Sequence, residues 1–109
     1  MAALPAAPQA LGNAYATVLN VTAGQTWRIQ YSAVANTGSA AQDLFVQLVD
    51  SDAGTTRLII PGTPIPGKLT IQPLFEGDLV LTGGDQLQAR GPTTGTVNLN
   101  MFLTYDNGT

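Results

Sequence analysis

The sequence contains no cysteine and no histidine in 109 residues. Without cysteine, the chain has neither a disulfide bond nor a thiolate nucleophile. Without histidine, it lacks the commonest general base and the commonest metal ligand, and no serine can be activated as in a Ser-His-Asp triad. We therefore expect a protein that is not an enzyme, that has no catalytic residue, and that binds no metal or cofactor.

Charged residues are scarce, at 10% of the chain against about 25% in ordinary domains. The four basic residues are Arg28, Arg57, Lys68 and Arg90, and they are scattered along a chain of net charge −3. Nucleic-acid binding usually needs a clustered basic face, so no nucleic-acid partner is expected. No run approaches the ~20 apolar residues of a spanning helix, so no membrane partner is expected. Low charge favours self-association instead.

Three groups of carboxylates resemble sites and are better explained as parts of turns or solvated segments. Glu76 and Asp78 form a pair, but in an extended segment both side chains point the same way and leave little room for a sugar. Asp50 and Asp52 resemble the start of a calcium loop that lacks its bidentate glutamate. Asp85 follows two glycines and is expected to accept hydrogen bonds from turn amides.

The first thirteen residues are rich in alanine and proline and predict an arm preceding a domain of residues 14–109. Pro5 and Pro8 disfavour a helix, and an extended arm at ~3.3 Å per residue could reach a neighbouring subunit. The candidate assembly residues are Leu4, Pro5, Pro8 and Leu11, whose two leucines favour docking. A disordered tail is the alternative.

Beyond the arm, apolar and polar residues alternate between regularly spaced turns, which is typical of a β-sandwich. About eight strands are expected in two antiparallel sheets, as in a jelly roll or an immunoglobulin-like sandwich. They fall near residues 14–21, 27–35, 44–49, 56–60, 68–72, 79–81, 86–90 and 97–104. The Pro- and Gly-rich residues 60–67 predict a loop or edge crossing. Within residues 27–35, the pattern assigns Trp27, Ile29, Tyr31, Ala33 and Ala35 to the core.

Tyr15 and Tyr105 are the aromatic residues that the pattern leaves available to a ligand. Aromatic rings stack on sugars, so these two tyrosines carry the alternative of a carbohydrate- or receptor-binding module, for example in a phage fibre. Trp27 and Tyr31 are instead expected in the core.

Several short segments together resemble small β-sandwich structural proteins of tailed-bacteriophage virions, of the capsid decoration (cement) or neck/collar type. The resemblance spans residues 17–105 and is carried by residues 24–29 (GQTWRI), 34–36 (VAN), 44–50 (LFVQLVD), 65–67 (IPG) and 81–89 (LTGGDQLQA). It implies a non-enzymatic structural role and localisation in the virion. The implied partners are major capsid or head–tail connector proteins and further copies of the chain, with a trimer favoured. Arm and edge-strand contacts would hold such an assembly together. A secreted or pilus-like β-sandwich stays open as a third alternative.

Overall fold

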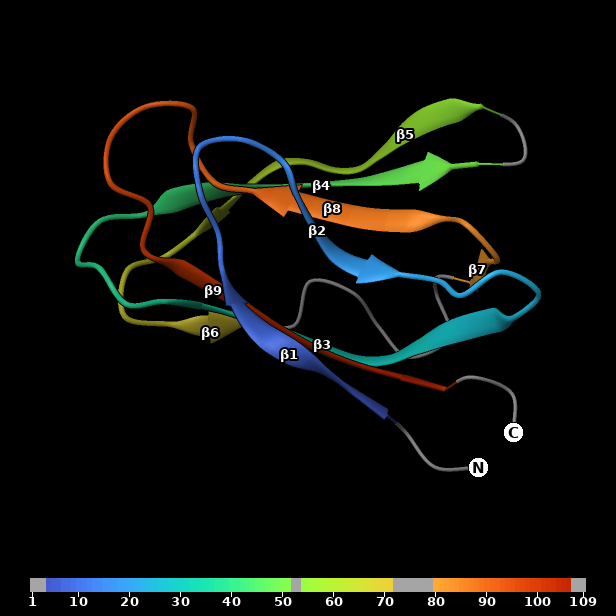
Figure 1. Cartoon of the computed structure of the whole chain (residues 1–109). Helices are drawn as coiled ribbons and strands as arrows, with labels where there is room; N and C mark the ends of the chain where they lie inside the picture. Colours follow the sequence, from blue (N-terminus) through green and yellow to red (C-terminus); the bar gives the residue numbers. More distant parts are fainter. Residues whose placement is uncertain (1–3, 52–53, 72–79, 107–109) are drawn as a thin grey trace.

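The computed structural model describes residues 4–51, 54–71 and 80–106, which form nine strands in two sheets. Figure 1 shows the sheets stacked as two layers. Sheet A, the lower layer, contains β1 (Leu4–Ala10), β3 (Thr26–Asn36), β6 (Thr70–Ile71), β7 (Val80–Thr82) and β9 (Leu99–Asp106). Sheet B, the upper layer, contains β2 (Ala16–Asn20), β4 (Gln42–Asp50), β5 (Thr55–Ile65) and β8 (Gln86–Arg90).

The strand pairs are nested along the chain, and every pair is antiparallel. β1 pairs with β9, β2 with β8, β3 with both β6 and β7, and β4 with β5. Further ladders join β3 to β9 and β4 to β8, which gives the orders β1-β9-β3-β6 and β2-β8-β4-β5. The predicted all-β fold of two antiparallel sheets is confirmed. The described residues form no helix, and so contain none that could cross a membrane.

Apolar side chains from both sheets meet in one core between the layers. β9 contributes Leu99, Met101 and Leu103, and β8 contributes Leu87 and Ala89. The other buried apolar residues are Leu11, Leu19, Val21, Trp27, Ile29, Val34, Leu44, Val46, Ile60, Ile65 and Leu81. Burial of apolar area stabilises a fold by about 25 cal/mol per Å², so this core is the main source of stability in a chain without disulfides.

A β-bulge in β3 corrects the predicted assignment of its faces. Trp27 and Ile29 are buried as expected, but the ladder to β9 shifts register between Ile29 and Tyr31. One extra residue reverses the alternation. Beyond the bulge, Ser32, Val34 and Asn36 point inward. The prediction that Tyr31 belongs to the core is therefore wrong: its side chain is 45% exposed. The same shift leaves Ala33 and Ala35 only partly buried.

The Pro- and Gly-rich segment that was expected to be a loop or edge crossing is largely the second half of β5. This strand runs on through Pro61 and Pro64 to Ile65. Proline cannot donate to a ladder, but β5 is the outermost strand of sheet B, so its prolines are tolerated there. Gly62 adopts φ +101°, a conformation that favours glycine, at a register shift opposite β4.

The described part of the predicted arm lies in sheet A of the same chain. Leu4–Ala10 forms β1 and pairs with β9, with a register shift between Ala6 and Gln9. β1 is an edge strand, which explains how a segment with two prolines can join a sheet. Strand pairing thus begins at Leu4, within the residues assigned to the arm, and the boundary after residue 13 stays a prediction. Exchange of this strand between subunits stays a prediction.

Candidate assembly surfaces

The outer face of sheet B carries a cluster in which an arginine lies against two aromatic rings. Phe45 on β4 lies opposite Arg90 on β8, so their side chains project from the same face. The Arg90 guanidinium carbon is 3.8 Å from the centroid of the Phe45 ring and 5.0 Å from that of Tyr15. Cation–π contacts at such distances contribute about 0.5–2 kcal/mol. The charge of Arg90 is therefore held in a fixed position.

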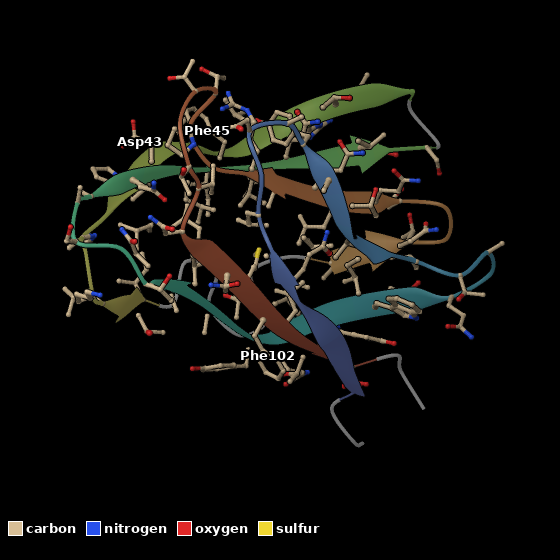
Figure 2. All side chains as sticks on the ribbon, turned by 60° about the vertical axis from the view of Figure 1, so that its left-hand side comes forward. Asp43, Phe45 and Phe102 are labelled. Atoms are coloured by element: carbon tan, nitrogen blue, oxygen red, sulfur yellow. The ribbon has the colours of Figure 1, made fainter. Side chains whose placement is uncertain are left out.

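The Phe45 ring is supported from the neighbouring strand as well. A Cβ atom added to Gly62 on β5 would lie 2.9 Å from Phe45 Cε2, so the absence of a side chain at residue 62 gives the ring its space. Pro61 is the cross-strand partner of Phe45, and Pro64 is that of Asp43. Figure 2 shows Asp43 and Phe45 on the outer side of β4.

Next to this cluster, amide side chains cover sheet B in a hydrogen-bonded row. Gln47 Nε2 donates to Gln88 Oε1 at 2.6 Å, and Gln88 Nε2 donates to Gln86 Oε1 at 3.2 Å. Thr17 on β2 donates to the same Gln86 oxygen at 3.3 Å. The row crosses three strands and makes this half of the face polar and uncharged, in keeping with the low charge of the chain.

The outer face of sheet A carries an aromatic pair. Tyr31 on β3 and Phe102 on β9 lie with ring centroids 6.5 Å apart at an angle of 59°, a tilted aromatic pair. Ala33 lies opposite Phe102 in the ladder. Figure 2 shows Phe102 on the side of the molecule opposite Asp43 and Phe45. The molecule therefore presents two chemically different outer faces.

The two predicted ligand-facing tyrosines are not brought together. Tyr105 stacks on Trp27 with ring centroids 4.2 Å apart and an angle of 17°, and it packs against the core. Tyr15 is half-buried and lies beside Arg90. Their use by a ligand stays a prediction, and the rings have protein neighbours on at least one side. Within the described residues there is no pocket.

Of the predicted arm residues, Leu11 belongs to the core, where it is 4% exposed. Its amide donates to the carbonyl of Leu99 at 2.9 Å, so the segment that follows β1 is tied to β9. Leu4, Pro5 and Pro8 lie in β1, with Leu4 opposite Tyr105 and Pro5 opposite Thr104. The use of these residues in assembly stays a prediction.

Of the carboxylates that resemble sites in the sequence, Asp85 has a structural role in a turn. Asp85 is buried and accepts hydrogen bonds from the amides of Ser51 and Thr82 at 3.2 and 3.0 Å, which confirms its predicted place in a turn. Glu76, Asp78 and Asp52 lie outside the described residues. Among the described ranges, no group of acidic side chains could hold a metal ion.

Sequence reasoning did not find the cluster around Arg90. Arg90 and Phe45 are 45 positions apart, and no local pattern indicates that β8 lies beside β4. The available signal was Phe45, an aromatic residue that falls on the same side of its strand as the polar residues Asp43 and Gln47. The contact between Phe45 and Arg90 follows only from the register between β4 and β8.

No protein-family model matches the chain, and no curated protein matches it. Among solved structures, the chain is similar to a chain of the T13 IBDV viral particle, with a TM-score of 0.54 and 12% identity over 97% of this chain and 35% of that one. It is also similar to a pentameric capsid protein isolated from metagenomic phage sequences, with a TM-score of 0.43 and 14% identity over 95% of this chain and 61% of that one. The chain thus spans between about a third and three fifths of these proteins' lengths. At such identities the likeness concerns the fold: the chain has a β-sandwich of the kind found in the IBDV particle.

Proposed function

We propose that the chain is a non-enzymatic structural subunit of a virion, built on a jelly roll. The observation that carries this proposal is the nested strand order, β1-β9-β3-β6 facing β2-β8-β4-β5. The five-stranded and four-stranded sheets, in this order, extend the eight-stranded jelly roll that is typical of viral capsid and lectin domains. The similar fold in the IBDV particle supports a capsid role over a lectin role.

The surface chemistry supports the same role. The described residues enclose no pocket and gather no metal-binding cluster, so the broad faces and the sheet edges are the features available for interactions. The molecule measures 41 × 30 × 19 Å, and its broad face is larger than the roughly 800 Å² that each partner contributes to a standard interface. Flat surfaces of this kind suit contacts between subunits.

Within the virion, the chain serves as a capsid decoration (cement) subunit or a neck/collar subunit of a bacteriophage, as the sequence resemblance implies. Its partners are major capsid or head–tail connector proteins and other copies of itself. β1 and the sheet edges supply contacts of the strand-addition type.

The carbohydrate- or receptor-binding alternative has less support from the geometry. It needs aromatic rings open to a sugar, whereas Tyr105 is stacked on Trp27 and Tyr15 has Arg90 beside its ring. Lectins also use the jelly roll, so the fold alone does not separate the two roles.

Co-purification tests the proposal. Particles from a culture that carries the gene are separated on a density gradient, and the chain is detected with an antibody in every fraction. We expect the chain to sediment with intact particles and to stay with them in high salt. Recovery of the chain in the soluble fraction alone, with none in the particle band, would contradict a virion role.

A further inference from the structure

The outer face of sheet B holds one fixed positive charge and one exposed negative charge that do not pair with each other within the chain. Arg90 lies against Phe45 and Tyr15, and its one hydrogen bond to the described residues runs from Nη1 to the carbonyl of Gly91, at 2.9 Å. Asp43 is exposed, and its carboxylate makes no hydrogen bond or ion pair with the described residues. Most donors of Arg90 and both oxygens of Asp43 are therefore available to another molecule.

The two charges belong to one small patch, defined here as the Arg90 patch: Tyr15, Asp43, Phe45, Pro61, Pro64 and Arg90. Asp43 and Phe45 project from the same side of β4 about 7 Å apart, because they are two residues apart in a strand. Figure 2 shows them side by side on that face. Arg90 is the cross-strand neighbour of Phe45 on β8, and the two prolines flank the patch from β5.

We infer that the Arg90 patch is a contact between two copies of this chain, in which Arg90 of each copy binds Asp43 of the other. A patch that carries both a donor and an acceptor around a central ring is self-complementary under a two-fold axis. Rotation about an axis near Phe45 brings each guanidinium to the partner's carboxylate and stacks the two apolar centres. The contact thus forms two equivalent ion pairs around a Phe45–proline centre.

The composition of the patch favours a second copy over an unrelated partner. A strongly acidic partner would be repelled by Asp43, and a strongly basic one by Arg90, whereas an identical patch satisfies both charges. Arginine held over an aromatic ring is also the kind of residue that dominates interfaces, because little of its freedom is lost on binding. The uncharged amide row beside the patch adds no opposing charge.

This contact deepens the proposed function and rests on it, since a shell or collar subunit must bind other copies. The contact relates two copies by a two-fold axis, so it is distinct from the three-fold contacts of the trimer that the sequence resemblance implies. It joins two chains into a dimer, or two trimers into a hexamer. In either case, loss of the contact halves the mass of the assembly.

Charge reversal tests the contact through the mass of the purified chain, measured by light scattering. Asp43→Lys and Arg90→Glu each place two like charges against each other, and each is expected to weaken the association about 100-fold, or about tenfold for each of the two pairs. Either variant alone therefore has half the mass of the unaltered assembly. Arg57→Glu, an exposed charge reversal on β5 of the same sheet, is the control and leaves the mass unchanged.

A mixture of the two variants gives the decisive result. In a mixed pair, the lysine introduced at position 43 of one copy faces the glutamate introduced at position 90 of the other. The unaltered Arg90 of the first copy faces the unaltered Asp43 of the second, so both ion pairs form and the full mass returns. Failure of the mixture to associate, or full mass for Asp43→Lys alone, would overturn the inference.

The test can be distinguished from misfolding of a variant and from failure of the proposed function. The Asp43 side chain makes no hydrogen bond or ion pair that its replacement would remove, so its variant stays informative if Arg90→Glu folds poorly. None of these outcomes bears on whether the chain sediments with particles, which tests the proposed function separately.

Discussion

At the scale of single residues, a buried asparagine holds one end of the sandwich together. The side-chain nitrogen of Asn36, at the end of β3, donates to the carbonyls of Ala40 and Ile65 at 2.9 Å each. Its side-chain oxygen accepts from the amide of Gly38 at 2.9 Å. The residue is 2% exposed and Ile65 is fully buried, so the carbonyl of Ile65 has no water as a substitute for this donor. Asn36 thereby joins sheet A to the end of β5 in sheet B.

Replacing Asn36 with alanine is expected to lower the free energy of unfolding by about 2–4 kcal/mol. Three hydrogen bonds of about 1 kcal/mol each are lost, and the buried carbonyl of Ile65 loses this donor. Urea unfolding followed by circular dichroism measures the change. Asn100→Ala is the matched control, because Asn100 is exposed on β9 and its loss should cost less than about 0.5 kcal/mol. Equal effects of the two substitutions would contradict the role assigned to Asn36.

Individual residues also show which parts of the structure the sequence predicts and which it does not. Alternation assigned Trp27 and Ile29 to the core correctly, because both residues precede the register shift in β3. It failed at Tyr31, because the extra residue of a bulge does not interrupt the pattern of residue types. The contact between Phe45 and Arg90 depends on which strands are neighbours, and alternation carries no information about that.

At the scale of elements, the edges of the sheets differ in how they are protected. β6 and β7 are two and three residues long, and β5 carries prolines and a register shift in its second half. Short strands, prolines and bulges are common devices against uncontrolled strand pairing. β1 also carries two prolines, but it covers β9 along five paired positions.

Deletion of residues 1–10 removes the contacts between subunits that are proposed for β1, so it is expected to lower the mass of the assembled chain. The truncated chain keeps Leu11, which is anchored to Leu99, so the core between the sheets is retained and the β-sheet signal in circular dichroism persists. If β1 supplies contacts between subunits, only the contact through the Arg90 patch remains, and the truncated chain is no larger than a dimer. A truncated chain with the mass of the full chain would show that β1 has no part in assembly.

The nested order of the strands could not be derived from the sequence, although the approximate positions of eight of the nine could. Each predicted segment overlaps one strand, but the segments alone fitted a jelly roll and an immunoglobulin-like sandwich equally well. The pairing of β1 with β9 joins segments almost a whole chain length apart. Such long-range pairing is decided by the packing of both sheets, and local residue patterns do not encode it.

At the scale of the whole molecule, the chain is a thin, weakly charged sandwich with two different outer faces. Sheet B presents the amide row and the Arg90 patch, and sheet A presents the Tyr31–Phe102 pair. A subunit within a shell or collar contacts several neighbours at once, so surfaces of different chemistry help each neighbour to find its own place. This division of surfaces agrees with a structural role and requires no catalytic group.

The most direct test of a virion role is a reconstruction of the purified particle by electron cryomicroscopy, at a resolution that traces individual strands. We predict repeated density on the shell or at the collar that fits two stacked sheets in the nested order, with Arg90 patches of neighbouring copies facing each other. A particle that contains no density for this sandwich, although the cells that produced it expressed the chain, would contradict the proposed function.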